Sequence, residues 1–224
     1  MNTKIFCDIA EINLIKKFNK KKIVNGFTTN PSLMRKAGAK NYLDYCKKIL
    51  KICKNKPISF EVFADDFNNM KHQAYKLNSL GNNVYVKIPV CNSKGKFSGK
   101  IIKLLNREKI KLNITAVYNA KQTKKILDCL DRKTNVIISI FVGRAGDAGK
   151  DSVPEIKKSI AMSKKFKNVK ILWASVREPY NYTHAKELKC DIITVPPAII
   201  EKIENFGKTF HKLTIETIKN FLVD

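Results

Sequence analysis

Short apolar runs alternate with segments of helical periodicity along the sequence. Eight runs are rich in β-branched residues and predict strands, at residues 4–9, 23–27, 58–62, 84–88, 112–117, 136–141, 170–174 and 191–195. The segments between and after them repeat apolar residues at helical spacing and predict helices at residues 42–54, 66–80, 97–108, 120–130, 155–165, 180–188 and 206–222. In residues 42–54, for example, the apolar positions form a single stripe suited to docking on a sheet.

Alternation of strands and helices predicts a parallel sheet. Eight strands without a linker or low-complexity break favour a single (β/α)8 TIM barrel over residues 1–224, with an extra C-terminal helix at about 206–222. An open doubly wound sheet is the alternative. It is less favoured because Ala10, Glu11 and Ile12 follow the first run, where a dinucleotide-binding fold would have its glycine-rich turn.

The composition allows a sizeable apolar core in a strongly basic chain. Of the 224 residues, 44% are hydrophobic, and 44 Lys and Arg outnumber 19 Asp and Glu, so that the net charge is +25. No apolar run approaches the roughly 18 residues of a membrane span, and Asp8 interrupts the N-terminal stretch in which a signal peptide would be apolar. We therefore expect a cytoplasmic protein that does not bind membranes.

The positive charge raises the question of nucleic-acid binding. Only five of the 44 basic residues are arginine, although the planar guanidinium suits phosphate and base recognition best. The lysines are spread over predicted helix faces without interleaved aromatic residues. We expect a solvated lysine surface that attracts anionic substrates and no nucleic-acid partner. A barrel that binds a polyanion without turnover remains an alternative of another class.

The cysteines and histidines do not predict a metal site. The six cysteines form no C-x-x-C pair, and the three histidines lie far apart in the sequence. We expect free cysteines that pack as small apolar residues, and neither a disulfide framework nor a bound metal.

Polar residues stand at or just beyond the ends of nearly all the predicted strands. In a barrel of this type the carboxyl ends of the strands carry the catalytic groups. The candidates, in chain order, are Asp8, Thr28, Thr29, Asn30, Glu61, Lys87, Asn113, Thr115, Ser139, Phe141, Arg144, Ser175 and Arg177.

Lys87 is the most informative candidate, because the other residues of its strand look buried. Desolvation of an inward-pointing lysine favours the neutral amine that Schiff-base chemistry requires. The alternative is a buried ion pair with Asp8 or Glu61, which are themselves either charge partners or general acid/base groups. Asn113 and Thr115 are two residues apart on one strand face, a spacing suited to holding a water or a substrate hydroxyl.

Five blocks of the sequence resemble the ordered signature of the transaldolase family. They are residues 26–33 (GFTTNPSL), 86–89 (VKIP), 113–115 (NIT), 139–144 (SIFVGR) and 174–177 (ASVR). The resemblance extends from Asp8 to Pro196, and the short length is similar to that of the subgroup that includes the fructose-6-phosphate aldolases.

The resemblance implies a role for each candidate in a reaction that needs no cofactor. Lys87 matches the Schiff-base lysine, Asp8 matches the general acid/base, and Glu61 with Thr115 matches the pair that activates a water. The remaining matches are substrate contacts: Asn30, Asn113 and Ser139 for the dihydroxyacetone hydroxyls, and Arg144, Ser175 and Arg177 for the phosphate of the sugar. Thr28 and Thr29 belong to the first block and are expected to line the same site.

Two positions bear on the reaction type. The aldolases of the family resemble one another in having Gln at the end of the third strand and Tyr in the sixth block, whereas this chain has Glu61 and Phe141. This favours transfer of the three-carbon unit, with an aldolase-like lyase as the alternative. Ile140 stands where the family usually has proline, so a modified sugar is a further alternative substrate.

The C-terminal helix points to self-association. Its apolar positions exceed what one barrel contact requires, and they are Phe206, Phe210, Leu213, Ile215, Ile218 and Phe221. Small members of the family that the chain resembles form pentamers paired into decamers through this helix. We therefore expect a homo-oligomer.

Overall fold

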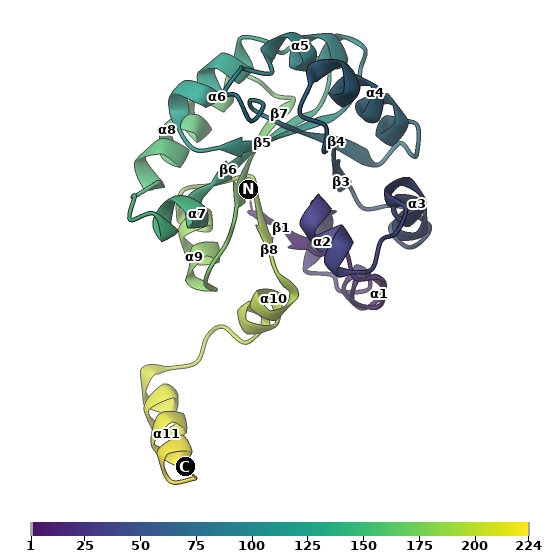
Figure 1. Cartoon of the computed structure of the whole chain (residues 1–224). Helices are drawn as coiled ribbons and strands as arrows, with labels where there is room; N and C mark the ends of the chain where they lie inside the picture. Colours follow the sequence, from purple (N-terminus) through teal and green to yellow (C-terminus); the bar gives the residue numbers. More distant parts are fainter. Residues whose placement is uncertain (1, 224) are drawn as a thin grey trace.

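The computed structural model describes residues 2–223, which form a closed barrel of eight parallel strands in the order β1 to β8 (Figure 1). The strands are β1 (Lys4–Asp8), β2 (Val24–Thr28), β3 (Ile58–Glu61), β4 (Val84–Pro89), β5 (Leu112–Val117), β6 (Val136–Phe141), β7 (Val169–Ala174) and β8 (Ile192–Val195). The predicted TIM barrel is confirmed, with all eight strands within two residues of their expected ends.

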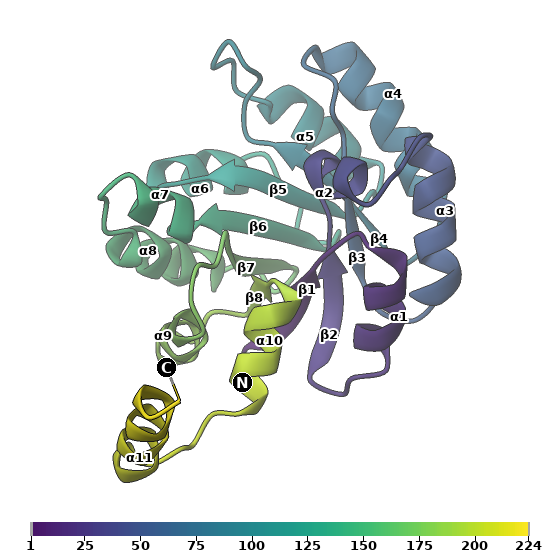
Figure 2. The same ribbon diagram turned by 60° about the horizontal axis from the view of Figure 1, so that its bottom comes forward.

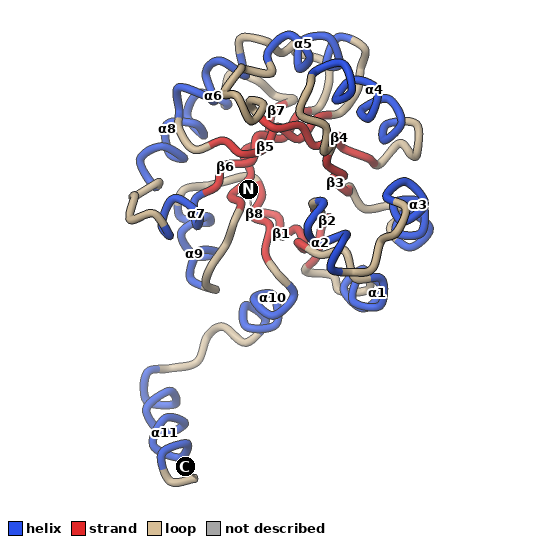
Figure 3. The backbone as a smooth tube through the Cα atoms, viewed as in Figure 1, coloured by secondary structure: helices blue, strands red, loops and turns tan. Residues whose placement is uncertain are grey.

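Helices surround the strands, as the blue and red tubes of Figure 3 show. They are α1 (Ile12–Asn19), α2 (Pro31–Lys36), α3 (Tyr42–Ile52), α4 (Phe67–Asn78), α5 (Gly99–Arg107), α6 (Ala120–Leu127), α7 (Val142–Asp147), α8 (Val153–Ser163), α9 (Tyr180–Glu187), α10 (Pro197–Glu204) and α11 (Phe210–Phe221). Four short helices, α1, α2, α7 and α10, were not predicted from the sequence. The start of α2 did carry a signal, since Asn30 caps it and Pro31 is its first residue.

Side chains of each strand alternate between the helices and the barrel interior. In β4, for example, Val84, Val86 and Ile88 belong to the large core between strands and helices. Tyr85 instead packs against a smaller cluster around Phe6 and Leu172. Lys87 has the same parity as Tyr85, so the pleat turns it into the barrel near the carboxyl end of its strand.

The C-terminal helix begins later than the sequence predicted. We expected a helix from Phe206, but α11 starts at Phe210. Gly207 has a φ of +99°, which ends any helical path there, and the side chain of Thr209 accepts a hydrogen bond from the Lys212 backbone NH as a new cap. In Figures 1 and 2, α11 stands away from the barrel, and it contains no buried residue.

The cysteines are free, as the sequence predicted, and four of the six are buried. Cys91 and Cys129 are partly exposed. Within residues 2–223, none of the helices has both the length and the apolar character needed to cross a bilayer.

Candidate active site

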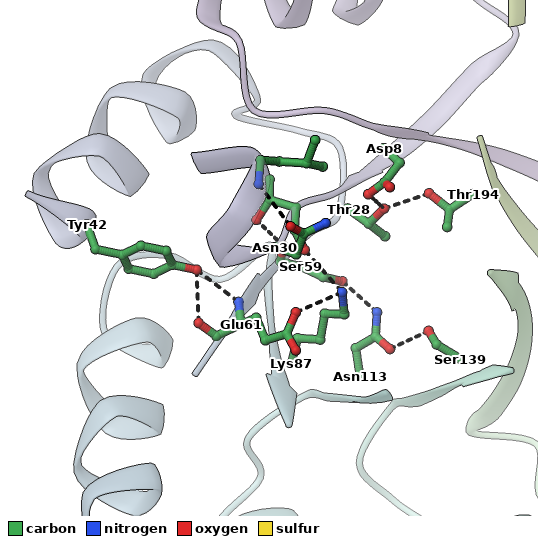
Figure 4. Close-up of polar contacts among 12 residues, drawn as sticks. Asp8, Thr28, Asn30, Tyr42, Ser59, Glu61, Lys87, Asn113, Ser139 and Thr194 are labelled. Carbon is green, nitrogen blue, oxygen red and sulfur yellow. Dashed lines mark hydrogen bonds and ion pairs between the residues drawn. The ribbon is translucent and has the colours of Figure 1, made fainter. Parts of the chain in front are cut away.

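The strand register brings candidate side chains of neighbouring strands together, and Figure 4 shows several of them, including Asp8, Lys87 and Asn113. Lys87 is paired in register with Glu61 on one side and with Asn113 on the other. Asp8 is paired in the same way with Thr28. Because all the strands are parallel, these residues share the carboxyl end of the barrel, where this fold carries its functional groups.

Lys87 is buried and paired with Glu61. Its side-chain nitrogen Nζ lies 3.0 Å from Glu61 Oε2 and donates a hydrogen bond of 3.2 Å to the backbone oxygen of Thr29. Lys87 is only 7% exposed. The ion pair considered as one alternative is thus present with Glu61. It also gives the amine a carboxylate neighbour placed to accept or return a proton, as Schiff-base chemistry would require.

Asp8 lies across the barrel mouth from this pair. The Thr28 hydroxyl donates to Asp8 Oδ1 at 2.7 Å and lies 2.6 Å from the hydroxyl of Thr194. Burial raises the pKa of Asp8 above its ordinary value, while the charge of Lys87 and the hydrogen bond from Thr28 act in the opposite direction. Thr194 was not predicted from the sequence. Its signal was a hydroxyl near the end of an otherwise apolar strand.

A chain of polar side chains crosses the interior between β3, β5 and β6. The Asn113 amide donates to the Ser59 hydroxyl at 3.0 Å, and the Ser139 hydroxyl donates to the Asn113 oxygen at 2.6 Å. Ser59 was also missed, although a serine between Ile58 and Phe60 has the parity of an inward residue. These two hydrogen bonds fix the orientation of the Asn113 amide, which lies on the strand next to Lys87.

Other predicted residues serve the local structure or remain unpaired. The Thr29 hydroxyl donates to the backbone oxygen of Ser59, and the side-chain oxygen of Asn30 caps α2. The hydroxyl of Thr115 is buried without any hydrogen-bond partner. A buried hydroxyl in that state is typical of a position that binds a water or a substrate oxygen.

A small hollow of about 140 Å³ extends from the carboxylate of Asp8 and the amine of Lys87 to a basic end that contains two arginines. Nine of the predicted residues line it, and they are Asp8, Thr28, Asn30, Lys87, Ser139, Phe141, Arg144, Ser175 and Arg177. Thr29, Glu61, Asn113 and Thr115 are not among its lining residues. The hollow therefore has one end suited to a carbonyl and hydroxyls and another suited to an anion.

The basic end depends on a close contact between α7, which contains Gly143, and Ser175, which follows β7. Ser175 has a φ of +64°, and its carbonyl oxygen would lie 1.7 Å from a Cβ atom at position 143, so only glycine fits there. Arg144 extends from the short helix α7, with its guanidinium 5.2 Å from the ring centre of Phe141. This packing places Arg144 and Ser175 around the same space.

Arg177 is held by a carboxylate that sequence analysis missed. Its Nε lies 3.0 Å from both oxygens of Asp147, and its Nη2 lies 2.5 Å from Asp147 Oδ2. The hydrogen bond and charge of Arg177 lower the pKa of Asp147. The two residues are 30 positions apart in the sequence, so local spacing gave no signal of this contact.

A larger hollow of about 850 Å³ opens at the amino ends of the strands. Lys4, Lys170 and Asp191 are among its lining residues, and Asp191 is already paired with Lys170 at 3.1 Å. None of the candidate residues lines it, so the smaller hollow is the candidate active site. In the part of the chain that the structure describes, no three His, Cys, Asp or Glu side chains gather as metal ligands would.

Comparisons with known proteins identify the family of this chain. A family model described as Transaldolase/Fructose-6-phosphate aldolase matches residues 5–224. A probable transaldolase of Nitrosopumilus maritimus is 35% identical over 224 residues, covering 99% of this chain and 94% of that protein. A probable transaldolase of Methanococcus vannielii is 34% identical, and the match covers 99% of this chain and 96% of that protein. One of Thermoplasma volcanium is 36% identical, and the match covers 94% of this chain and 92% of that protein.

Solved structures show the same architecture at much lower identity. Two crystal structures of proteins from Burkholderia cenocepacia J2315 match with TM-scores of 0.58 and 0.59 and sequence identities of 6% and 10%. Both matches cover 91% of this chain, and they cover 89% and 80% of the solved chains. At this identity the likeness shows the fold alone.

Proposed function

Because this chain belongs to the transaldolase/fructose-6-phosphate aldolase family, we propose that it is a transaldolase that transfers a dihydroxyacetone unit from a ketose phosphate to an aldose phosphate. The donors proposed are fructose 6-phosphate and sedoheptulose 7-phosphate. The observation that carries the proposal is the buried Lys87 at the carboxyl end of β4, with Glu61 3.0 Å away and a basic pocket end beyond it.

In the first half of the proposed reaction, Lys87 becomes the Schiff base. Glu61 accepts a proton from the lysine, and the free amine adds to the C2 carbonyl of the ketose. Glu61 then returns the proton through a water held by the unpaired hydroxyl of Thr115, and the C2 hydroxyl leaves as water. The product is an iminium ion, which attracts the electrons of the bond that breaks next.

In the second half, Asp8 takes the proton of the C4 hydroxyl. The C3–C4 bond breaks, an aldehyde phosphate leaves, and the bonding electrons form a three-carbon enamine on Lys87. An aldose phosphate then accepts the enamine carbon, and Asp8 gives its proton to the new hydroxyl. This bond formation restores an iminium ion on Lys87, and water adds to its C2 carbon by the reverse of the first half, which releases the product ketose and the free lysine. The raised pKa of Asp8, which follows from its burial, favours this exchange of a proton in both directions.

The remaining residues are proposed to hold the substrate. Asn30, Asn113 and Ser139 bind the hydroxyls of the three-carbon unit, with Thr28 and Thr29 beside them. Arg144, Ser175 and Arg177 bind the phosphate, since guanidinium groups grip phosphate oxygens in pairs. Phe141 keeps this wall apolar, and with Glu61 at the end of β3 it supports transfer over hydrolysis of the enamine.

The exposed α11 supports a proposed homo-oligomer, such as a pentamer or decamer in the cytoplasm. The side chains of Phe210 and Phe221 are 90% and 72% exposed, which is unusual for large aromatic residues in an isolated subunit. A second copy of the chain offers an apolar surface of the same composition.

The test is the mass of the protein after borohydride reduction with fructose 6-phosphate. We expect a three-carbon adduct on Lys87 that disappears when an aldose phosphate is added before the reductant. Lys87→Met should form none. Lys170→Met is the matched control, because this strand lysine is paired with Asp191 at the other end of the barrel and should leave the adduct unchanged. An adduct that the acceptor does not discharge would favour an aldolase. No adduct with any ketose would favour a non-catalytic polyanion-binding barrel.

A further inference from the structure

The phenol of Tyr42 binds both backbone groups of Glu61. Its hydroxyl donates to the Glu61 carbonyl oxygen at 2.9 Å and accepts from the Glu61 NH at 3.2 Å (Figure 4). No other side chain among residues 2–223 forms hydrogen bonds with both the backbone NH and the backbone carbonyl of a proposed catalytic residue.

This contact replaces a missing part of the sheet. The β2–β3 pairing covers only Phe27 with Ile58 and Thr28 with Ser59, so it ends before Glu61. On the other side of β3, the ladder to β4 continues, and the Val62 NH donates to the Lys87 carbonyl oxygen. Backbone groups of successive strand residues point to opposite sides, so the NH and carbonyl of Glu61 face the side where β2 has ended. Without Tyr42 these two groups would have no strand partner.

Tyr42 is itself firmly placed. It is the first residue of α3, whose cap is the side chain of Asn41, and its ring packs edge-on against Phe63 with 5.2 Å between ring centres. Burial raises the pKa of the Tyr42 phenol, so the hydroxyl stays protonated. A neutral phenol has both a hydrogen to donate and lone pairs to accept, as the two bonds to Glu61 require.

We propose that Tyr42 is a positioning residue that fixes the end of β3 and thereby the reach of the Glu61 carboxylate to Lys87. The proposal rests on the transaldolase mechanism above. It predicts that loss of the phenol slows the step in which Glu61 moves protons for Lys87, because reacting groups lose rate steeply when displaced by about 1 Å. Binding of the sugar phosphate, at the other end of the hollow, should be unaffected.

The experiment compares Tyr42→Phe with Tyr45→Phe. Tyr45 lies on the same helix, and its hydroxyl donates to the carbonyl oxygens of Ala10 and Ala37, both at 3.1 Å. Each variant therefore loses one phenol bonded to backbone, and only one of them touches Glu61. For Tyr42→Phe we expect kcat and the single-turnover rate of adduct formation to fall about 10- to 100-fold, with KM within about twofold. For Tyr45→Phe we expect kcat and the single-turnover rate to stay within about twofold of the parent values.

A second readout separates positioning from a general loss of structure. In a Glu61→Gln background, Tyr42→Phe should add little further loss, because the two changes act on the same proton-transfer step. The proposal would be overturned if Tyr42→Phe lowered the rate by the same factor in the Glu61→Gln background as in the parent. Equal kcat values for Tyr42→Phe and Tyr45→Phe would also overturn it. If Tyr42→Phe does not fold, Phe63→Leu decides, since it keeps the phenol but removes its edge-on neighbour. A fall in kcat of about threefold at constant KM would support the proposal, and an unchanged kcat would overturn it.

These outcomes are distinct from failure of the proposed function. If the parent protein forms no adduct at Lys87, the transaldolase mechanism fails. If the parent forms the adduct and Tyr42→Phe forms it at the parent rate, only the role of Tyr42 fails.

Discussion

Lys87 and Glu61 form an ion pair, 3.0 Å from Nζ to Oε2, between neighbouring strands at the carboxyl end of the barrel. The amine and the carboxylate therefore meet before any substrate is present. In the proposed mechanism, the first step moves a proton from Lys87 to Glu61.

The Glu61→Gln substitution tests that first step. The amide keeps a hydrogen bond to Lys87 but cannot accept its proton, so adduct formation should slow by about 100- to 10,000-fold, the range for loss of a general base. Single-turnover borohydride trapping measures the rate directly. Glu201→Gln, which loses only an exposed pair with Lys17, should react at the parent rate. Equal rates for the two variants would remove Glu61 from the mechanism.

The pH dependence of kcat should report Asp8. The carboxyl must be ionised to take the C4 hydroxyl proton, so activity falls as the pH drops through its pKa. Burial raises this pKa and the Thr28 hydrogen bond lowers it, so Thr28→Val should raise it further and move the acid limb to higher pH. Thr194→Val should move the limb less, because its hydroxyl touches that of Thr28 but has no hydrogen bond to Asp8. A limb that moves to lower pH would contradict the assignment.

Asp147 should affect phosphorylated substrates selectively. It holds Arg177 through Nε and Nη2, which leaves the other edge of the guanidinium free for the phosphate. In Asp147→Asn the guanidinium loses this orientation, and KM for phosphorylated aldoses should rise about 10-fold while unphosphorylated glyceraldehyde reacts as before. Asp128→Asn, in an exposed pair with Lys124, is the control. A lower KM would mean that Asp147 competes with the phosphate.

Substitution of Phe141 should change whether the enamine is transferred to an acceptor or hydrolysed. A phenol at this wall of the hollow would help to place a water for hydrolysis, so Phe141→Tyr should release free dihydroxyacetone several-fold faster without an acceptor. An enzymatic assay for dihydroxyacetone measures this release. Phe166→Tyr, on the rim of the larger hollow, supplies the control. Unchanged release would show that position 141 does not select between transfer and hydrolysis.

Removal of α11 should dissociate the assembly and leave the barrel folded. The helix contains no buried residue, so a chain that ends at Phe206 loses little of its own core. Sedimentation measures the assembly, and the melting temperature at low protein concentration measures the barrel. An unchanged sedimentation profile would show that the helix does not join the subunits.

The sequence predicted the barrel from strand periodicity, and nine of the pocket residues from their places at or after strand ends and from the family resemblance. Once the strand containing Lys87 is recognised, the pleat and the parallel register determine which residues surround the lysine. Tyr42 and Asp147 escaped prediction because their contacts depend on how a helix docks, which local periodicity does not encode. Thr194 and Ser59 were accessible in principle, since each is a hydroxyl on an inward face of an apolar strand.

The strand pairing also divides the barrel into two arcs. The seams β2–β3 and β7–β8 have only two paired positions each, whereas the pairs β6–β7 and β1–β8 have six and four. Asp8 and Thr28 stand on the arc β8–β1–β2, while Lys87 and Glu61 stand on the arc β3–β7. Partial opening is easiest where the fewest backbone hydrogen bonds break. The barrel should therefore open first at these two seams, which would separate the Asp8 carboxylate from that of Glu61 while each arc stays folded.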